Sequence, residues 1–60
     1  MKNNQKELYI HTISGDSYLV EIYESSGGVS IAIAGKKIGL EINSALDLAD
    51  AILMTVSDIE

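Results

Sequence analysis

Residues 27–56, GGVSIAIAGKKIGLEINSALDLADAILMTV, hold the pattern that decides the fold. Apolar residues alternate over 29–34 and again over 37–42, which predicts two strands because successive side chains of a strand point to opposite faces. Gly35-Lys36 fits the loop between them, since glycine permits the positive φ that a type II′ turn needs at its first position. With the apolar pairs all on one face, this loop predicts the cross-strand pairs Ala34–Lys37, Ile33–Ile38, Ile31–Leu40 and Val29–Ile42.

An amphipathic helix follows and is predicted to begin near Ser44. Ser44 is a favourable N-cap, and Asp47 lies three positions later, like the acid of a capping box. Asp47 and Asp50 also suit the positive N-terminal end of the helix dipole. The apolar stripe spans roughly 160° of the helical wheel and comprises Leu46, Leu48, Ala49, Ile52, Leu53 and Val56. So wide a stripe exceeds what a small sheet can cover, which predicts oligomerisation.

The first half of the chain predicts another hairpin, with strands over 7–13 and 18–24. Its register is open. A two-residue Gly15-Asp16 loop points three side chains of the first strand to the core: Tyr9, His11 and Ile13. A three-residue loop shifts the pairing by one residue and reverses that assignment. In both cases one face of this strand carries apolar side chains away from the core.

These elements predict an α+β fold: a four-stranded antiparallel sheet of two hairpins, with one C-terminal helix packed on one face. Residues 1–6 are expected to form a disordered tail and residues 7–60 a single domain. A chain of 60 residues buries only about 60% of its unfolded surface. Without cysteine, and with His11 as its single histidine, the chain offers neither a disulfide nor the usual zinc ligands. No metal or cofactor is therefore predicted, and a homodimer is.

The charge of the chain limits the kinds of partner it can bind. The net charge is −5, from nine acidic residues against four lysines. Because nucleic-acid binding rests on neutralising phosphates with basic side chains, this balance argues against a nucleic-acid partner.

No apolar run approaches the length of a membrane span, and the polar start MKNNQK lacks the apolar part of a secretory signal. We expect a cytoplasmic protein with no membrane contact, in the host cytoplasm if a phage encodes it.

Two surfaces are candidates for contacts with other chains. The sheet face turned away from the helix is predicted to be flat, rich in small residues and edged by tyrosine, which suits close approach of a partner; the alternative is a solvated face. The helix flank is the other. The candidate interface residues are Leu19, Tyr23, Ala32, Ala34, Gly39, Leu46 and Leu53. Asp47 and Asp50 are either a candidate acidic contact or a solvated helix turn.

No constellation of catalytic residues is apparent. No serine has a base beside it in the sequence, and His11 has no second histidine or cysteine near it. We therefore expect a protein that is not an enzyme. The enzymatic alternative requires a site shared across a dimer, for instance His11 beside an acidic residue of the other chain.

The ββββα order resembles the single-stranded-DNA-binding coactivators of the positive cofactor 4 type. The resemblance covers about residues 7–57, with short local sequence similarities at 35–40 (GKKIGL) and 56–59 (VSDI). It implies a dimer formed through the helix and DNA binding across curved sheets. The chain departs from that family in its acidic charge and in lacking the basic, aromatic binding face on which bases stack. It also resembles small acidic phage accessory proteins, including inhibitors of bacterial defence systems.

The leading hypothesis is a non-enzymatic, homodimeric protein-binding module, of the phage type that inhibits a host enzyme by protein–protein contact. The alternative is a single-stranded nucleic-acid-binding protein with a positive cofactor 4-like fold.

Overall fold

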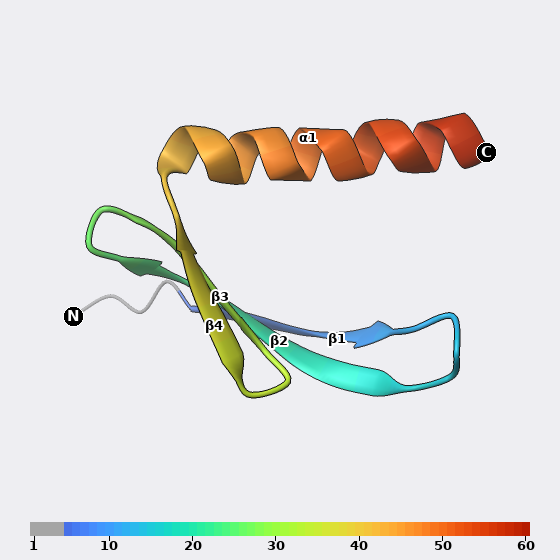
Figure 1. The fold of residues 1–60 in the computed structure, drawn as a ribbon, viewed down its shortest axis with the longest axis horizontal. Coiled ribbons are helices and arrows are strands. Elements are labelled where there is room, and N and C mark those ends of the chain that lie inside the picture. Colours follow the sequence, from blue (N-terminus) through green and yellow to red (C-terminus); the bar gives the residue numbers. More distant parts are fainter. Residues whose placement is uncertain (1–4) are drawn as a thin grey trace.

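Four antiparallel strands pair in chain order to form one open sheet, and a single helix follows them (Figure 1). The computed structural model describes residues 5–60. Its elements are β1 (Lys6–His11), β2 (Ser17–Ser25), β3 (Gly28–Ile33), β4 (Lys36–Leu40) and α1 (Ile42–Ile59). The predicted α+β class is confirmed. Of the expected tail, residues 1–4 lie outside the described residues, and Lys6 belongs to β1.

The second and third hairpins turn through two residues each, Ser26-Gly27 and Ala34-Gly35. Both turns have positive φ at both central positions, 54° and 78°, as a type I′ turn requires. The predicted Gly35-Lys36 loop is therefore wrong, because Ala34 belongs to the turn and Lys36 already belongs to β4. The type I′ turn moves the β3–β4 pairing by two residues from the predicted one.

That shift leaves the apolar faces intact. Ile31 now lies opposite Ile38, and Val29 opposite Leu40. Because side chains alternate with a period of two, a two-residue shift keeps every side chain on its predicted face. The face assignment of β3 and β4 is thus confirmed, although the predicted partners were wrong.

The first hairpin has a longer loop than either option considered. Five residues, Thr12 to Asp16, connect β1 to β2. The Thr12 N–H donates to the Asp16 carbonyl at 2.8 Å, and the Asp16 N–H donates to Thr12 Oγ1 at 2.9 Å. Ile13 therefore lies in the loop and is fully exposed.

This loop sets the register of β1. Leu8 pairs with Val20 and Ile10 with Tyr18. Leu8 and Ile10 consequently share a face with the apolar residues of β2, whereas Tyr9 and His11 lie on the other face. The assignment from the two-residue Gly15-Asp16 loop was wrong, and the reversed one is observed.

We call the sheet face beneath α1 the inner face and the opposite one the outer face. The inner face is aliphatic at its centre, with charged residues at its margins. The strand pairing gives it Lys6, Leu8, Ile10, Tyr18, Val20, Ile22, Glu24, Val29, Ile31, Ile33, Lys36, Ile38 and Leu40. Despite this composition the core is small. Val20, 7% exposed, is the one buried apolar side chain among residues 5–60.

The helix starts two residues earlier than predicted. Its N-cap is Glu41, which makes no side-chain capping bond, so the prediction of a Ser44 cap is wrong. Because β4 ends at Leu40, Ile42 is free to begin the helix rather than continue the strand. The first helical turn contains no acidic residue. Asp47 and Asp50 therefore lie too far along to interact with the N-terminal dipole.

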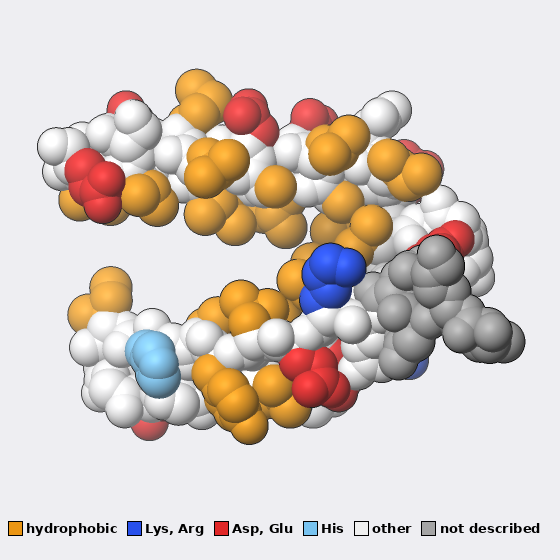
Figure 2. Space-filling view, turned by 180° about the vertical axis from the view of Figure 1, so that it is seen from behind, with side chains coloured by type: hydrophobic (Ala, Val, Ile, Leu, Met, Phe, Trp, Pro, Cys, Tyr) orange, Lys and Arg blue, Asp and Glu red, His pale blue; other side chains and the backbone are white. Residues whose placement is uncertain are grey.

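The helix lies over the inner face but diverges from it. Its main contact with the sheet is to β3, and none of its side chains is buried. In Figure 1, α1 runs above the sheet from the β4 end toward the β1–β2 loop, with its C-terminal half clear of the strands. The space-filling view in Figure 2 shows an opening between the helix and the sheet, with apolar side chains on both walls. We call this opening the wedge.

Candidate interaction surfaces

The closed end of the wedge is an apolar cavity between α1 and the middle of the sheet. Its volume is about 260 Å³. The lining residues are Ile22, Val29, Ile31, Leu40, Ala45, Leu48, Ala49 and Ile52. These four helical positions follow the i, i+3, i+4, i+7 spacing of one helix face. The sequence therefore does direct one stripe of α1 toward the sheet, although it does not fill the space between them.

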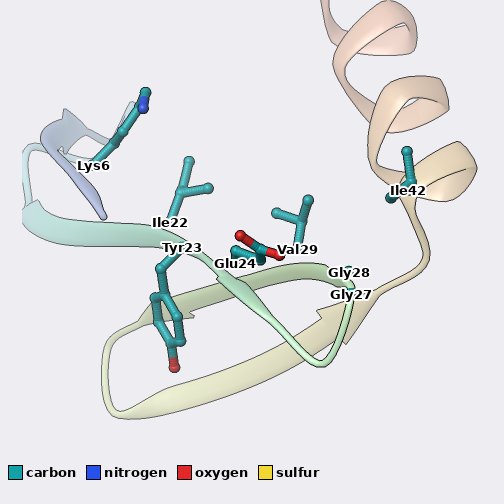
Figure 3. A pocket seen from close by; sticks show the side chains of 8 residues that line it. All are labelled: Lys6, Ile22, Tyr23, Glu24, Gly27, Gly28, Val29 and Ile42. Carbon is teal, nitrogen blue, oxygen red and sulfur yellow. The ribbon is translucent and has the colours of Figure 1, made fainter. Parts of the chain in front are cut away.

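A second hollow, of about 330 Å³, adjoins the start of α1. In Figure 3 the Lys6, Ile22 and Val29 side chains rise from the sheet on the side where Ile42 and the helix lie. Tyr23 points to the other side, toward the outer face. The hollow is thus apolar at its floor, and it has Lys6 and Glu24 among its lining residues.

The open end of the wedge leaves the C-terminal half of the helix uncovered. Val56 and Ile59 continue the stripe that faces the sheet, four and seven residues after Ile52; Ile59 is 79% exposed. Leu46 and Leu53, the predicted interface residues of the helix, lie on the adjoining flank and are 62% and 68% exposed. An isolated chain thus presents a long apolar helix surface to water.

The outer face carries most of the other predicted interface residues. Strand pairing places Leu19, Tyr23, Ala32 and Gly39 on it together. Ala34 is instead in the β3–β4 turn, at the edge of this face. A shallow hollow of about 310 Å³ lies here, and its lining includes Leu19, Glu21, Ala32, Ala34 and Lys37.

Tyr9 is an outer-face residue that the sequence placed there only under the three-residue-loop alternative. It lies directly opposite Leu19 and is 70% exposed. Its position follows from the five-residue β1–β2 loop, and the one signal in the sequence was Thr12, whose hydroxyl closes that loop. The pair adds an aromatic ring to a face that was predicted to consist mainly of small residues.

Two carboxylates also meet on the outer face. Glu7 lies directly opposite Glu21, an arrangement that is destabilising for like charges. The Gln5 side-chain amide donates to both, at 3.2 Å to Glu7 Oε2 and 3.2 Å to Glu21 Oε2. This local negative charge lies beside the Tyr9–Leu19 pair.

His11 makes a polar contact that the sequence did not predict. Its Nδ1 lies 2.8 Å from Ser17 Oγ across the β1–β2 pair. Both side chains are exposed. Over residues 5–60 no carboxylate bonds to the other ring nitrogen, and no group of three potential metal ligands occurs.

Within residues 5–60 no helix has the length and apolar character to cross a membrane.

Asp47 and Asp50 lie three residues apart on α1 and are exposed. On a helical wheel they share a side with Met54, away from the stripe that faces the sheet. They lie away from the wedge, but Asp50 borders the flank, because it comes four residues after Leu46 and three before Leu53. The acidic pair is therefore separate from the wedge and adjoins the flank.

A scan against protein-family models, a search of curated proteins and a search of solved structures each find no significant match to the chain.

Proposed function

We propose that the chain is a non-catalytic, homodimeric protein-binding module whose outer sheet face contacts the protein partner. The observation that carries this proposal is the exposed Tyr9–Leu19 pair, on the face that folding does not use. Aromatic residues are enriched in protein interfaces, because a tyrosine offers a large apolar surface with a polar end. Tyr23, Ala32 and Gly39 extend the same face as a flat surface.

The carboxylates on the β1–β2 side of this face favour a basic partner surface, whereas Lys37 lies on its β4 side. Glu7 and Glu21 lie directly opposite each other and share the Gln5 amide, and a cationic side chain of a partner beside them would offset their remaining repulsion. The net charge of −5 acts in the same direction at longer range. Inhibition of a host enzyme is the form of this function suggested by the likeness to phage accessory proteins.

The test is affinity capture with matched variants. Wild-type protein, Tyr9→Ser and Met54→Ser are immobilised and exposed to the same bacterial lysate. Met54 is an exposed apolar residue on the opposite side of the molecule from the outer face. We expect one dominant protein retained by wild type and by Met54→Ser and lost with Tyr9→Ser. Equal retention by all three, or no retained protein from several lysates, would contradict the proposal. If the captured protein is an enzyme, its activity in the complex tests inhibition.

Single-stranded nucleic-acid binding is the second candidate, favoured by one observation. The outer face carries Tyr9, His11 and Tyr23, three rings of the kind on which bases stack. Fluorescence anisotropy with labelled single-stranded DNA and RNA at low salt tests it. Binding that weakens steeply with salt and is lost in Tyr9→Ser would support this candidate. No change in anisotropy at about 100 μM protein would eliminate it.

A further inference from the structure

The chain exposes more surface than a compact protein of its size. Its accessible area is 5171 Å², whereas a folded monomer of 6.4 kDa is expected to expose about 3,800 Å². A generous allowance of about 700 Å² for residues 1–4 leaves about 4,500 Å² for residues 5–60, against about 3,600 Å² expected for a folded chain of their mass, an excess of about 900 Å². A standard protein interface takes about 800 Å² from each partner. The excess therefore matches one interface per chain.

Part of this exposed apolar area lies around the wedge. On the helix, Ile52, Val56 and Ile59 point toward the sheet and are all more than 40% exposed. On the facing wall, Leu8 and Tyr18 of the inner face are also exposed. Figure 2 shows these two walls as opposed apolar surfaces that do not meet. Whatever fills the wedge must therefore be apolar on two sides.

The occupant must also be present whenever the chain folds. With Val20 as the one buried apolar side chain of the described part, a lone chain has too small a core to supply the usual stability of a domain. An occasional partner does not solve this problem, but a second copy is always available. The same chain also carries a complementary surface: the stripe of Ile52, Val56 and Ile59 on the C-terminal half of α1 is apolar and exposed, as are the walls of the wedge.

We propose that the wedge of each chain is filled by the C-terminal half of α1 from a second copy. We call this reciprocal arrangement of two chains the clasp. A two-fold axis makes such an interface self-complementary, since each helix end enters the wedge of the other chain. The flank of Leu46 and Leu53 then lies between the two helices. This inference rests on the homodimer in the proposed function and assigns the surface that forms it, leaving the outer face free.

Two variants separate the clasp from a general effect of charge on α1. Val56 and Met54 are both exposed in the single chain, at 43% and 61%, but only Val56 lies on the stripe that faces the wedge. Changing either one to Asp adds the same charge to the same helix. We expect Val56→Asp to raise the dimer dissociation constant at least about 30-fold, the threshold for a hot-spot residue, and Met54→Asp to leave it unchanged. Equal dissociation constants for the two variants, measured by sedimentation, would overturn the proposal.

Cross-linking covers the case in which Val56→Asp fails to fold. The wild-type chain has no cysteine, so single-cysteine variants react at one place. Tagged Tyr18→Cys is mixed with untagged Val56→Cys, or with Met54→Cys as control, and treated with a short bis-maleimide. We expect tagged–untagged dimers with Val56→Cys, in clear excess over Met54→Cys. Equal yields would overturn the clasp.

The outcome is independent of the outer-face partner, because both experiments use the purified chain alone. Tyr9→Ser should retain the wild-type dimer and cross-link while losing the captured protein. If the wild-type chain captures no protein but the cross-link still forms, the proposed function is refuted and the clasp stands.

Discussion

The inner and outer faces of one sheet differ in nearly every property, although their residues alternate along the same strands. Along β2, Val20 and Ile22 point inward, while Leu19, Glu21 and Tyr23 point outward. The inner face is mainly aliphatic, with Lys6, Glu24 and Lys36 at its margins, and its apolar area continues onto α1, so it serves folding and assembly. The outer face mixes tyrosines, carboxylates and small residues, a composition suited to recognition. The difference separates two tasks in a chain of only 60 residues.

The largest difference in stability is expected when a charge is placed on each face in turn. Val20→Asp buries a carboxylate where the side chain is 7% exposed, at a cost of several kcal/mol. We expect this variant to be unfolded. Leu19→Asp, its neighbour on the outer face, should change the free energy of unfolding by less than about 1 kcal/mol. Circular dichroism during thermal unfolding distinguishes the two; similar losses would show that the outer face also belongs to the core.

Substitutions in the β3–β4 turn test whether its type I′ conformation sets the pairing register of β3 and β4. Gly35 has φ of 78°, so Gly35→Ala should cost about 1–2 kcal/mol. Ala34 has φ of 54°, and Ala34→Asn should stabilise by about 0.5–1 kcal/mol, because asparagine tolerates this conformation in type I′ turns. Chemical denaturation gives both values. A loss of stability in Ala34→Asn would argue for the Gly35-Lys36 turn instead.

A smaller effect is expected from the carboxylates of the outer face. Glu7→Gln removes the repulsion from Glu21 directly opposite, and should stabilise by about 0.2–1 kcal/mol at low salt. The gain should shrink as added salt screens exposed charges. Melting temperatures at two ionic strengths test this, and a destabilised variant would show that weakening the Gln5–Glu7 hydrogen bond outweighs the relief of repulsion.

The smallest effect is predicted for Gly39→Ala. A Cβ built at Gly39 would lie 3.9 Å from Ser30 Oγ, an ordinary contact. The change should therefore alter the free energy of unfolding by less than about 0.5 kcal/mol, as denaturant titration can measure. A loss of partner binding with unchanged stability would place Gly39 within the recognition surface.

Much of the fold was predictable because the apolar alternation of β2, β3 and β4 survives changes of register. Val29 and Ile31 keep their face even though their partners differ from the predicted ones. The turn itself was less predictable, because glycine fits both a type I′ and a type II′ turn and only the position of Ala34 distinguishes them.

The candidate surfaces were predictable in part. Leu19, Tyr23, Ala32 and Gly39 share the outer face as expected. Tyr9 was assigned to the wrong face by one option, since the register of β1 depends on a loop closed by Thr12 and Asp16. The helix start was also missed, because Ser44 is a favourable cap by residue type, whereas the end of β4 decides where the helix begins.

Sedimentation equilibrium of the wild-type chain at micromolar concentration tests most directly whether the inner face and α1 form an assembly surface. We predict a mass of twice 6.4 kDa, with a melting temperature that rises with protein concentration, as for any dimer that unfolds to separate chains. A species of 6.4 kDa that melts cooperatively at a temperature independent of protein concentration would contradict assembly through the inner face and α1.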